Sequence, residues 1–180
     1  MSQSIQAQKA SSGLMYIFGT GSIAIGVKNS LLGTFLLVYF NQVLGLPAYL
    51  AASAMGLALV VDAISDPLVG IWSDRVRSRF GRRHPFMYAA IIPFAFSYYF
   101  ILQNPGSISE GTISEGELFQ RLLILMVIMR LSMTFYEVPR GALAPELTKD
   151  YDQRNQISGI GMAFGWVGGA GMASLAYRYF

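Results

Sequence analysis

Two aspartates lie four residues apart inside a long apolar stretch. Asp62 and Asp66 are followed directly by Pro67. On a helix this spacing puts both carboxylates on one face about one turn apart, where they repel each other unless a cation or a proton lies between them. Proline frees backbone carbonyls in the preceding turn, and carboxylate and carbonyl oxygens are the ligands that hard cations prefer. The pattern favours a cation or proton site; the alternative is that one or both acids form structural ion pairs with basic residues of neighbouring helices.

A third acid, Glu137, lies in another apolar stretch, two residues before a proline. An ionisable side chain at the centre of a bilayer costs about 2.5–3.5 kcal/mol, so each such residue requires a reason. Glu137 lies a few residues past the middle of its stretch, as Asp66 does, so the three acids can share one level in a membrane. We expect Glu137 either to complete the coupling site with the two aspartates or to pair with Arg130 or Arg140.

Lys28 and Asn29 interrupt the first apolar stretch near its centre. They could face a substrate cavity, or Lys28 could be the internal partner of the aspartate pair. Arg130 is a further basic group within the apolar sequence, in the same stretch as Glu137. We take Lys28, Asn29 and Arg130 as the candidate substrate contacts.

Long apolar segments must position these groups. The sequence of 180 residues is 53% hydrophobic and 13% charged. None of the segments alternates as a strand does, and at about 1.5 Å rise per residue each can cross the roughly 30 Å hydrocarbon layer. We predict an all-α membrane protein in which residues 12–180 form an incomplete transmembrane domain, after a disordered cytosolic tail at 1–11. Its five helices are expected at about 14–40, 49–72, 86–102, 118–143 and 157–180.

The charges of the connections predict the orientation. The segment from 103 to 117 holds three glutamates and no basic residue, whereas the connection before it carries five arginines, at 75, 77, 79, 82 and 83. Basic residues of short loops stay on the cytosolic side, so the amino terminus is predicted to be cytosolic. The last apolar segment still continues at Phe180, so we expect the sequence to be part of a longer protein.

Composition excludes several functional classes. The chain has no cysteine and a single histidine, His84, so a disulfide, a thiol nucleophile or a thiolate metal site is excluded. No nucleophile and base pair, metal cluster or phosphate-binding loop occurs in an aqueous segment, so we do not expect an enzyme. The net charge of +3 is explained by the loop arginines, so nucleic acid is not an expected partner.

Small residues mark a packing face on the last apolar segment. Gly161, Gly165 and Gly169 recur at four-residue spacing. Small residues at this spacing allow two helices to approach closely in a membrane. We therefore expect this face to contact another helix rather than to form a site.

A motif follows the aspartate pair at the junction of the second and third segments. The residues that carry this loop motif are Gly70, Asp74, Arg75, Gly81, Arg82 and Arg83. Together with the stretch from Glu137 to Arg154, the motif resembles the glycoside-pentoside-hexuronide:cation symporter family of the major facilitator superfamily, over nearly the whole chain.

The resemblance implies a fold of about twelve helices in two pseudo-repeated halves, of which this chain supplies not quite one. By position, Asp62, Asp66 and Glu137 match carboxylates that coordinate the coupling cation in the family, with Glu137 in place of an aspartate. A Na⁺ site at these three residues is therefore implied. The loop motif matches one that forms charge locks between conformations. The missing half of the transporter is an implied partner.

These observations together predict a secondary active transporter of the plasma (inner) membrane. We expect Na⁺- or H⁺-coupled symport of a small solute such as a sugar or glycoside, with no cofactor besides the coupling ion. Solute, cation and lipid bilayer are the expected partners. One alternative is a lysolipid or lipid carrier of the same fold, in which Lys28 and Arg130 meet a head group. Another is a truncated membrane fragment that does not transport.

Overall fold

The computed structural model describes residues 10–76, 78–79 and 81–179. All regular structure in these residues is helical, and five helices are long and apolar enough to cross a membrane, which confirms the predicted fold class. Residues 1–9, which make up most of the predicted cytosolic tail, lie outside the described residues. The chain divides into two compact units, one formed by residues 1–33 and 141–180 and the other by residues 34–140.

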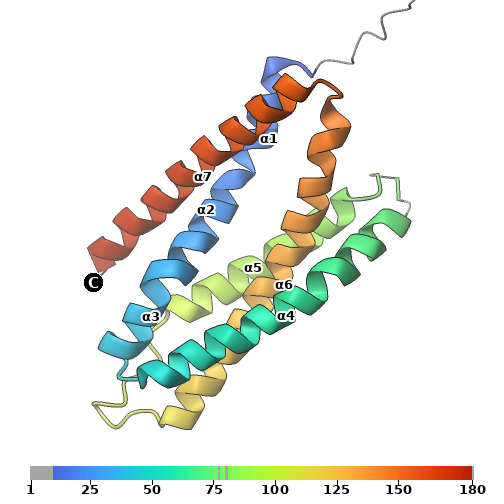
Figure 1. The fold of residues 1–180 in the computed structure, drawn as a ribbon. Helices are drawn as coiled ribbons and strands as arrows, with labels where there is room; N and C mark the ends of the chain where they lie inside the picture. Colours follow the sequence, from blue (N-terminus) through green and yellow to red (C-terminus); the bar gives the residue numbers. More distant parts are fainter. Residues whose placement is uncertain (1–9, 77, 80, 180) are drawn as a thin grey trace, which may run out of the picture. The chain divides into compact units, whose positions relative to one another are not determined.

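The first unit is built from helices that are far apart in the sequence. It contains α1 (Ser12–Thr20), α2 (Ser22–Ser30) and α7 (Tyr151–Tyr179). Figure 1 shows α7 running alongside α1 and α2. The backbone N–H of Ala10 donates to Gln153 Oε1 at 2.9 Å, so the start of the first span is attached to the start of the last.

Glycine allows α2 and α7 to approach with almost no side chain between them. A Cβ atom on Gly26 would overlap the carbonyl oxygen of Gly165, and one on Gly168 would overlap that of Ile23. Ser30 Oγ donates to the carbonyl oxygen of Gly169 at 3.0 Å. The predicted packing face of α7 is thus confirmed, and its partner is α2.

The first span continues beyond α2 into the second unit as far as Val43. Two π-helical turns, η1 (Leu31–Phe35) and η2 (Tyr39–Val43), flank the short α3 (Leu36–Val38). A turn then leads to α4, and the backbone N–H of Ile108 donates to the Leu44 carbonyl oxygen at 3.0 Å. The loop between the third and fourth spans is thereby attached to this turn.

Three long helices make up most of the second unit. They are α4 (Ala48–Arg75), α5 (His84–Leu102) and α6 (Glu115–Leu147), the last of which extends into the first unit. Aromatic rings from all three meet near one end: the ring centroids of Trp72 and Phe86 are 5.2 Å apart, and that of Phe135 lies 6.0 Å from Trp72 and 5.8 Å from Phe86. This cluster packs α4, α5 and α6 together near the end of α4 that carries Arg75.

Capping residues set two helix ends that hydrophobicity alone does not locate. Glu117 Oε2 accepts from the backbone N–H and the hydroxyl of Ser114, which is a capping box that starts α6 at Glu115. Asp150 Oδ1 accepts from the backbone N–H of Asp152 at 2.9 Å and starts α7. Both helices therefore begin several residues before the apolar ranges 118–143 and 157–180.

Candidate functional site

Two polar contacts join α4 to α6 within the membrane-spanning segments. The Arg130 guanidinium donates to the Asp62 carboxylate and forms an ion pair with it. One turn further along α4, the hydroxyl oxygens of Ser65 and Thr134 lie 3.3 Å apart, within hydrogen-bond distance. The two pairs are separated by 68 and 69 residues in the sequence, so α4 and α6 run in the same direction with a constant offset.

The contact at Gly70 extends this register toward the end of α4. A Cβ on Gly70 would lie 3.6 Å from Val138 Cγ1, again 68 residues away. At this offset Asp66 is level with the turn of α6 that holds Thr134, and Glu137 lies about one turn further along. The three predicted acids therefore lie within about two turns of one another along two facing helices.

For Asp62 the ion-pair alternative is realised. Its side chain is 22% exposed and that of Arg130 is 14% exposed, so the pair is largely shielded. Arg130 Nε is also buried and has no acceptor among the described residues. A buried N–H without an acceptor costs about 1–3 kcal/mol, so this group gains from any acceptor brought to it.

Asp66 differs from Asp62 although it lies on the same face. Its side chain is exposed, and within the described part of the chain no ion pair or hydrogen bond of its carboxylate occurs. α4 continues through Pro67, which provides no N–H for the carbonyl of Ala63. Among the described residues, a carboxylate without a partner and a carbonyl without its usual helical N–H donor therefore lie within one turn of each other.

Glu137 is half-buried on the face of α6 that also carries Thr134. Arg140 follows three residues later, is 9% exposed, and is close enough for the two charges to attract each other. α6 continues through Pro139 between them. Among the described residues, no three His, Cys, Asp or Glu side chains lie close enough together to hold a metal ion. A cation site at Asp62, Asp66 and Glu137 stays a prediction.

Ser65 and Thr134 are the site residues that the sequence analysis missed. Both are buried, at 8% and 4% exposure. Helical spacing could have found them, because Ser65 lies three residues after Asp62 and Thr134 lies three residues before Glu137, on the same faces as the acids. Their hydroxyl oxygens add neutral polar atoms to the face that also carries Asp62 and Arg130.

Lys28 and Asn29 lie in the last turn of α2, in the first unit. Lys28 is half-buried and Asn29 is exposed. Their role as substrate contacts, and that of Arg130, stays a prediction.

Within the described residues of the loop motif, Arg83 and Asp74 form an ion pair. Arg83 Nη2 lies 2.8 Å from Asp74 Oδ1, and the Arg83 side chain is 12% exposed whereas that of Asp74 is 59% exposed. Gly81 has φ of +93°, a conformation that favours glycine. Arg75 ends α4, and both it and Arg82 are exposed. Arg83, rather than Arg75 or Arg82, is the arginine paired with Asp74 among the described residues. The motif's neighbours at positions 77 and 80 lie outside them.

Five helices that are long and apolar enough to cross a membrane, two of which are joined by an ion pair, define the class: an integral, multi-pass α-helical membrane protein. The family of MFS/sugar transport proteins matches residues 17–180. The chain belongs to this family. The resemblance to cation symporters of the major facilitator superfamily is thereby confirmed.

Three curated relatives show the extent of the similarity. The chain is 33% identical to an uncharacterized symporter of Synechocystis sp. (strain PCC 6803), over 98% of this chain and 32% of that protein. It is 22% identical to the isoprimeverose transporter of Lactiplantibacillus pentosus, over 89% and 32%. It is 27% identical to the sodium-dependent lysophosphatidylcholine symporter 1 of Gallus gallus, over 81% and 26%. The chain spans about a third of the length of these relatives or less.

Proposed function

We propose that this chain serves secondary active transport in a plasma (inner) membrane and is not an enzyme. The transport is symport of a small solute, a sugar or glycoside, driven by Na⁺ or H⁺ through alternating access. The observation that carries the proposal is the polar face shared by α4 and α6, where Asp62 pairs with Arg130 and the hydroxyls of Ser65 and Thr134 meet one turn further along. The family and the named symporters among the relatives support the same class.

The oxygen atoms on this face suit a hard cation. Asp66 offers a carboxylate, Ser65 and Thr134 offer hydroxyls, and the Ala63 carbonyl has lost its helical N–H partner. Oxygen ligands of this kind suit Na⁺, and a proton can take the same place on Asp66. Glu137, one turn away on α6, supplies a further carboxylate if the helices close on the ion.

Asp62 links the cation to the solute. A cation bound beside Asp66 shares the negative charge of Asp62, so the attraction between Asp62 and Arg130 becomes weaker. The Arg130 guanidinium, whose Nε has no acceptor in the described part of the chain, is then available to a solute hydroxyl. Lys28 and Asn29, in the first unit, stay candidate solute contacts from the sequence alone. Because cation and solute each favour the state in which Arg130 is released, binding of one promotes binding of the other.

A lipid substrate is the second candidate, favoured by the similarity to the lysophosphatidylcholine symporter. In that case Arg130 meets a phosphate instead of hydroxyl groups. The two candidates differ in their competitors: isoprimeverose competes for a sugar site, and lysophosphatidylcholine competes for a lipid site.

Uptake into proteoliposomes with an inward Na⁺ or H⁺ gradient tests the proposal. Radiolabelled isoprimeverose and lysophosphatidylcholine are the two probes. Asp66→Asn is expected to abolish stimulation by the gradient while exchange without a gradient persists. Asp152→Asn, an exposed aspartate in the first turn of α7, is the matched control and should retain stimulation. Unchanged stimulation in Asp66→Asn contradicts the coupling role, and a gradient response with neither probe contradicts both solute classes.

A further inference from the structure

A polar cluster joins the residue before the cap of α1 to the connection between α6 and α7, within the first unit. The side-chain amide of Gln153 contacts the backbone of Ala10 twice: Oε1 accepts from the N–H at 2.9 Å, and Nε2 donates to the carbonyl oxygen at 3.4 Å. The next residue, Ser11, caps α1 by accepting from the N–H of Leu14. Gln153 therefore holds the place from which the first span begins.

The amide of Gln153 is itself held in place. Thr148 is 1% exposed; its hydroxyl donates to Gln153 Oε1 at 2.8 Å and accepts from the backbone N–H of Asp150 at 3.1 Å. Arg154 Nε donates to the carbonyl oxygen of Thr148 at 3.0 Å. All four residues belong to the stretch that carries the family resemblance, and the proposed cation site includes none of them. A buried threonine thus fixes the direction in which the amide points.

The packing of α1 and α2 against α7 leaves their axial position to bonds of this kind. The contacts at Gly26 and Gly168 are made with backbone atoms, so they provide no side chains that interlock. Ile160 and Phe164 lie over Gly19, but apolar contacts have no preferred direction. A hydrogen bond requires a short distance and a favourable angle, so it fixes where one helix lies along another.

Hydrogen bonds act near both ends of this helix pair. At one end Gln153 binds the backbone of Ala10, and at the other Ser30 Oγ donates to the carbonyl oxygen of Gly169 at 3.0 Å. A serine hydroxyl can turn to a carbonyl of its own helix instead. Gln153 uses a donor and an acceptor on one residue, so of the two contacts it restricts the axial position more.

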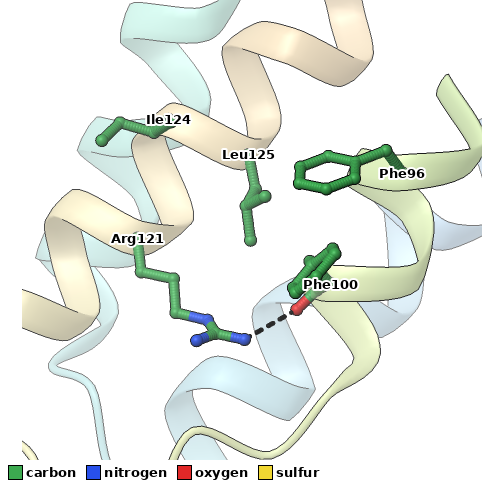
Figure 2. Close-up of a pocket in the computed structure, with 5 residues that line it drawn as sticks. All are labelled: Phe96, Phe100, Arg121, Ile124 and Leu125. Carbon is green, nitrogen blue, oxygen red and sulfur yellow. Dashed lines mark hydrogen bonds between the residues drawn. The ribbon is translucent and has the colours of Figure 1, made fainter. Parts of the chain in front are cut away.

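A bond from a side chain to a backbone also joins two helices in the second unit. Figure 2 shows Arg121 of α6 donating from Nη2 to the carbonyl oxygen of Phe100 in α5, at 3.0 Å. Side chains of both helices, among them Phe96 and Leu125, lie around this bond. There the bond is added to contacts between side chains, whereas the closest approach of α2 and α7 is made by backbone atoms. We therefore expect the axial position of α2 to depend more on its polar bonds than that of α5 does.

We propose that Gln153 is a positioning residue that fixes the axial register of α1 and α2 along α7. Without its bonds, the glycine contacts allow α1 and α2 to slide along α7 by up to one turn, about 5.4 Å. Lys28 and Asn29 lie in the last turn of α2, so the same bonds set the level of these candidate solute contacts. This last step rests on the proposed function, whereas the register itself does not.

Distances between two spin labels, measured by electron spin resonance on the full chain in lipid nanodiscs, test the register. The chain has no cysteine, so Ile17→Cys on α1 and Leu175→Cys on α7 provide the labelled positions. These residues are 71% and 62% exposed and lie at different heights of the helix pair, so their distance changes when one helix slides. Gln153→Leu should shift or broaden the distance distribution by up to one turn. Gln153→Glu keeps the accepting oxygen and should restore the narrow distribution.

Gln156→Leu is the matched control. It makes the same change three residues later on α7, at an exposed glutamine whose side chain has no hydrogen bond among the described residues, and should leave the distances unchanged. Ala10→Pro removes the N–H from which Gln153 accepts and should reproduce the effect of Gln153→Leu, with circular dichroism to check that the helices remain. Unchanged distances in Gln153→Leu or Ala10→Pro would overturn the proposal, as would an equal shift in Gln156→Leu.

Uptake into proteoliposomes separates the register from the solute site. Gln153→Leu should raise the solute concentration for half-maximal uptake several-fold and change the maximal rate less. Shifted distances with an unchanged half-maximal concentration would refute the link to Lys28 and Asn29. Absence of uptake by the unchanged protein would contradict the proposed function, and the spin-label distances would still decide the register.

Discussion

The ion pair between Asp62 and Arg130 gives a quantitative test of the α4 and α6 interface. Asp62→Asn leaves the Arg130 charge without its carboxylate. Removing one partner of a fully buried pair costs about 3–5 kcal/mol, whereas exposed pairs contribute about 0–1 kcal/mol. With side chains 22% and 14% exposed, this pair lies nearer the buried case. We expect the free energy of unfolding to fall by about 2–3 kcal/mol.

The double variant separates the energy of the ion pair from the effects of changing each side chain alone. Arg130→Gln removes the positive charge that Asp62→Asn leaves without a partner. Adding Arg130→Gln to Asp62→Asn should therefore restore about 1.5–2 kcal/mol of the lost free energy of unfolding. Unfolding in sodium dodecyl sulfate, followed by the fluorescence of Trp72 in its aromatic cluster on α4, measures all four proteins of the cycle. Strictly additive losses, with a coupling energy below about 0.5 kcal/mol, would refute the assignment of this pair as the contact that joins the two helices.

Asp66→Asn provides the internal control for that experiment. The same chemical change is made one turn along the same face, but at an exposed carboxylate with no ion pair in the described part of the chain. We expect its stability to stay within about 0.5 kcal/mol of the unchanged protein. A loss as large as that of Asp62→Asn would show that Asp66 also has a structural partner.

Further predictions concern packing, the loop pair and the hydroxyl ligands. Gly168→Ala should destabilise the first unit by about 1–3 kcal/mol, because its Cβ meets the Ile23 backbone, whereas Gly171→Ala, which meets nothing within 4 Å, should not; equal unfolding curves would contradict the packing. Arg83→Gln should cost at most about 1 kcal/mol, less in 1 M NaCl, since the Asp74 side of the pair is exposed; a loss above about 2 kcal/mol in thermal unfolding would contradict this. Thr134→Val should raise the Na⁺ concentration for half-maximal uptake several-fold, and an unchanged value would exclude this hydroxyl as a ligand.

The sequence predicted which residues share one face of a helix, but it did not predict which residues contact each other between helices. The periodic acids of α4 and the glycines of α7 predicted which residues share a face, and the second prediction is confirmed by the close approach of α2. Arg130 was weighed as a partner of Glu137, seven residues away on one helix, a distance of about 10.5 Å along the axis. Asp62 lies level with Arg130 on the facing helix and is its ion-pair partner.

The loop motif is a second case in which the sequence did not predict the partner in an ion pair. Arg75, Arg82 and Arg83 all lie in the loop motif with Asp74, and their order in the sequence does not show which of them pairs with it. The glycine turn at Gly81 and the start of α5 at His84 turn the chain so that Arg83 reaches Asp74 at 2.8 Å. Which side chain completes a loop ion pair depends on this backbone path, and a single sequence carries little information about it.

The pairing of the first span with the last has a consequence for synthesis. Ala10 and Gln153, which bond to each other, are 143 residues apart, and α1 and α2 pack against α7. At about 5–20 residues per second, the ribosome needs on the order of ten seconds to make the intervening chain. Throughout that interval the face of α2 around Gly26 is in the bilayer without the helix that covers it. Biogenesis of the first unit therefore ends only when α7 has been inserted, after all the spans between them.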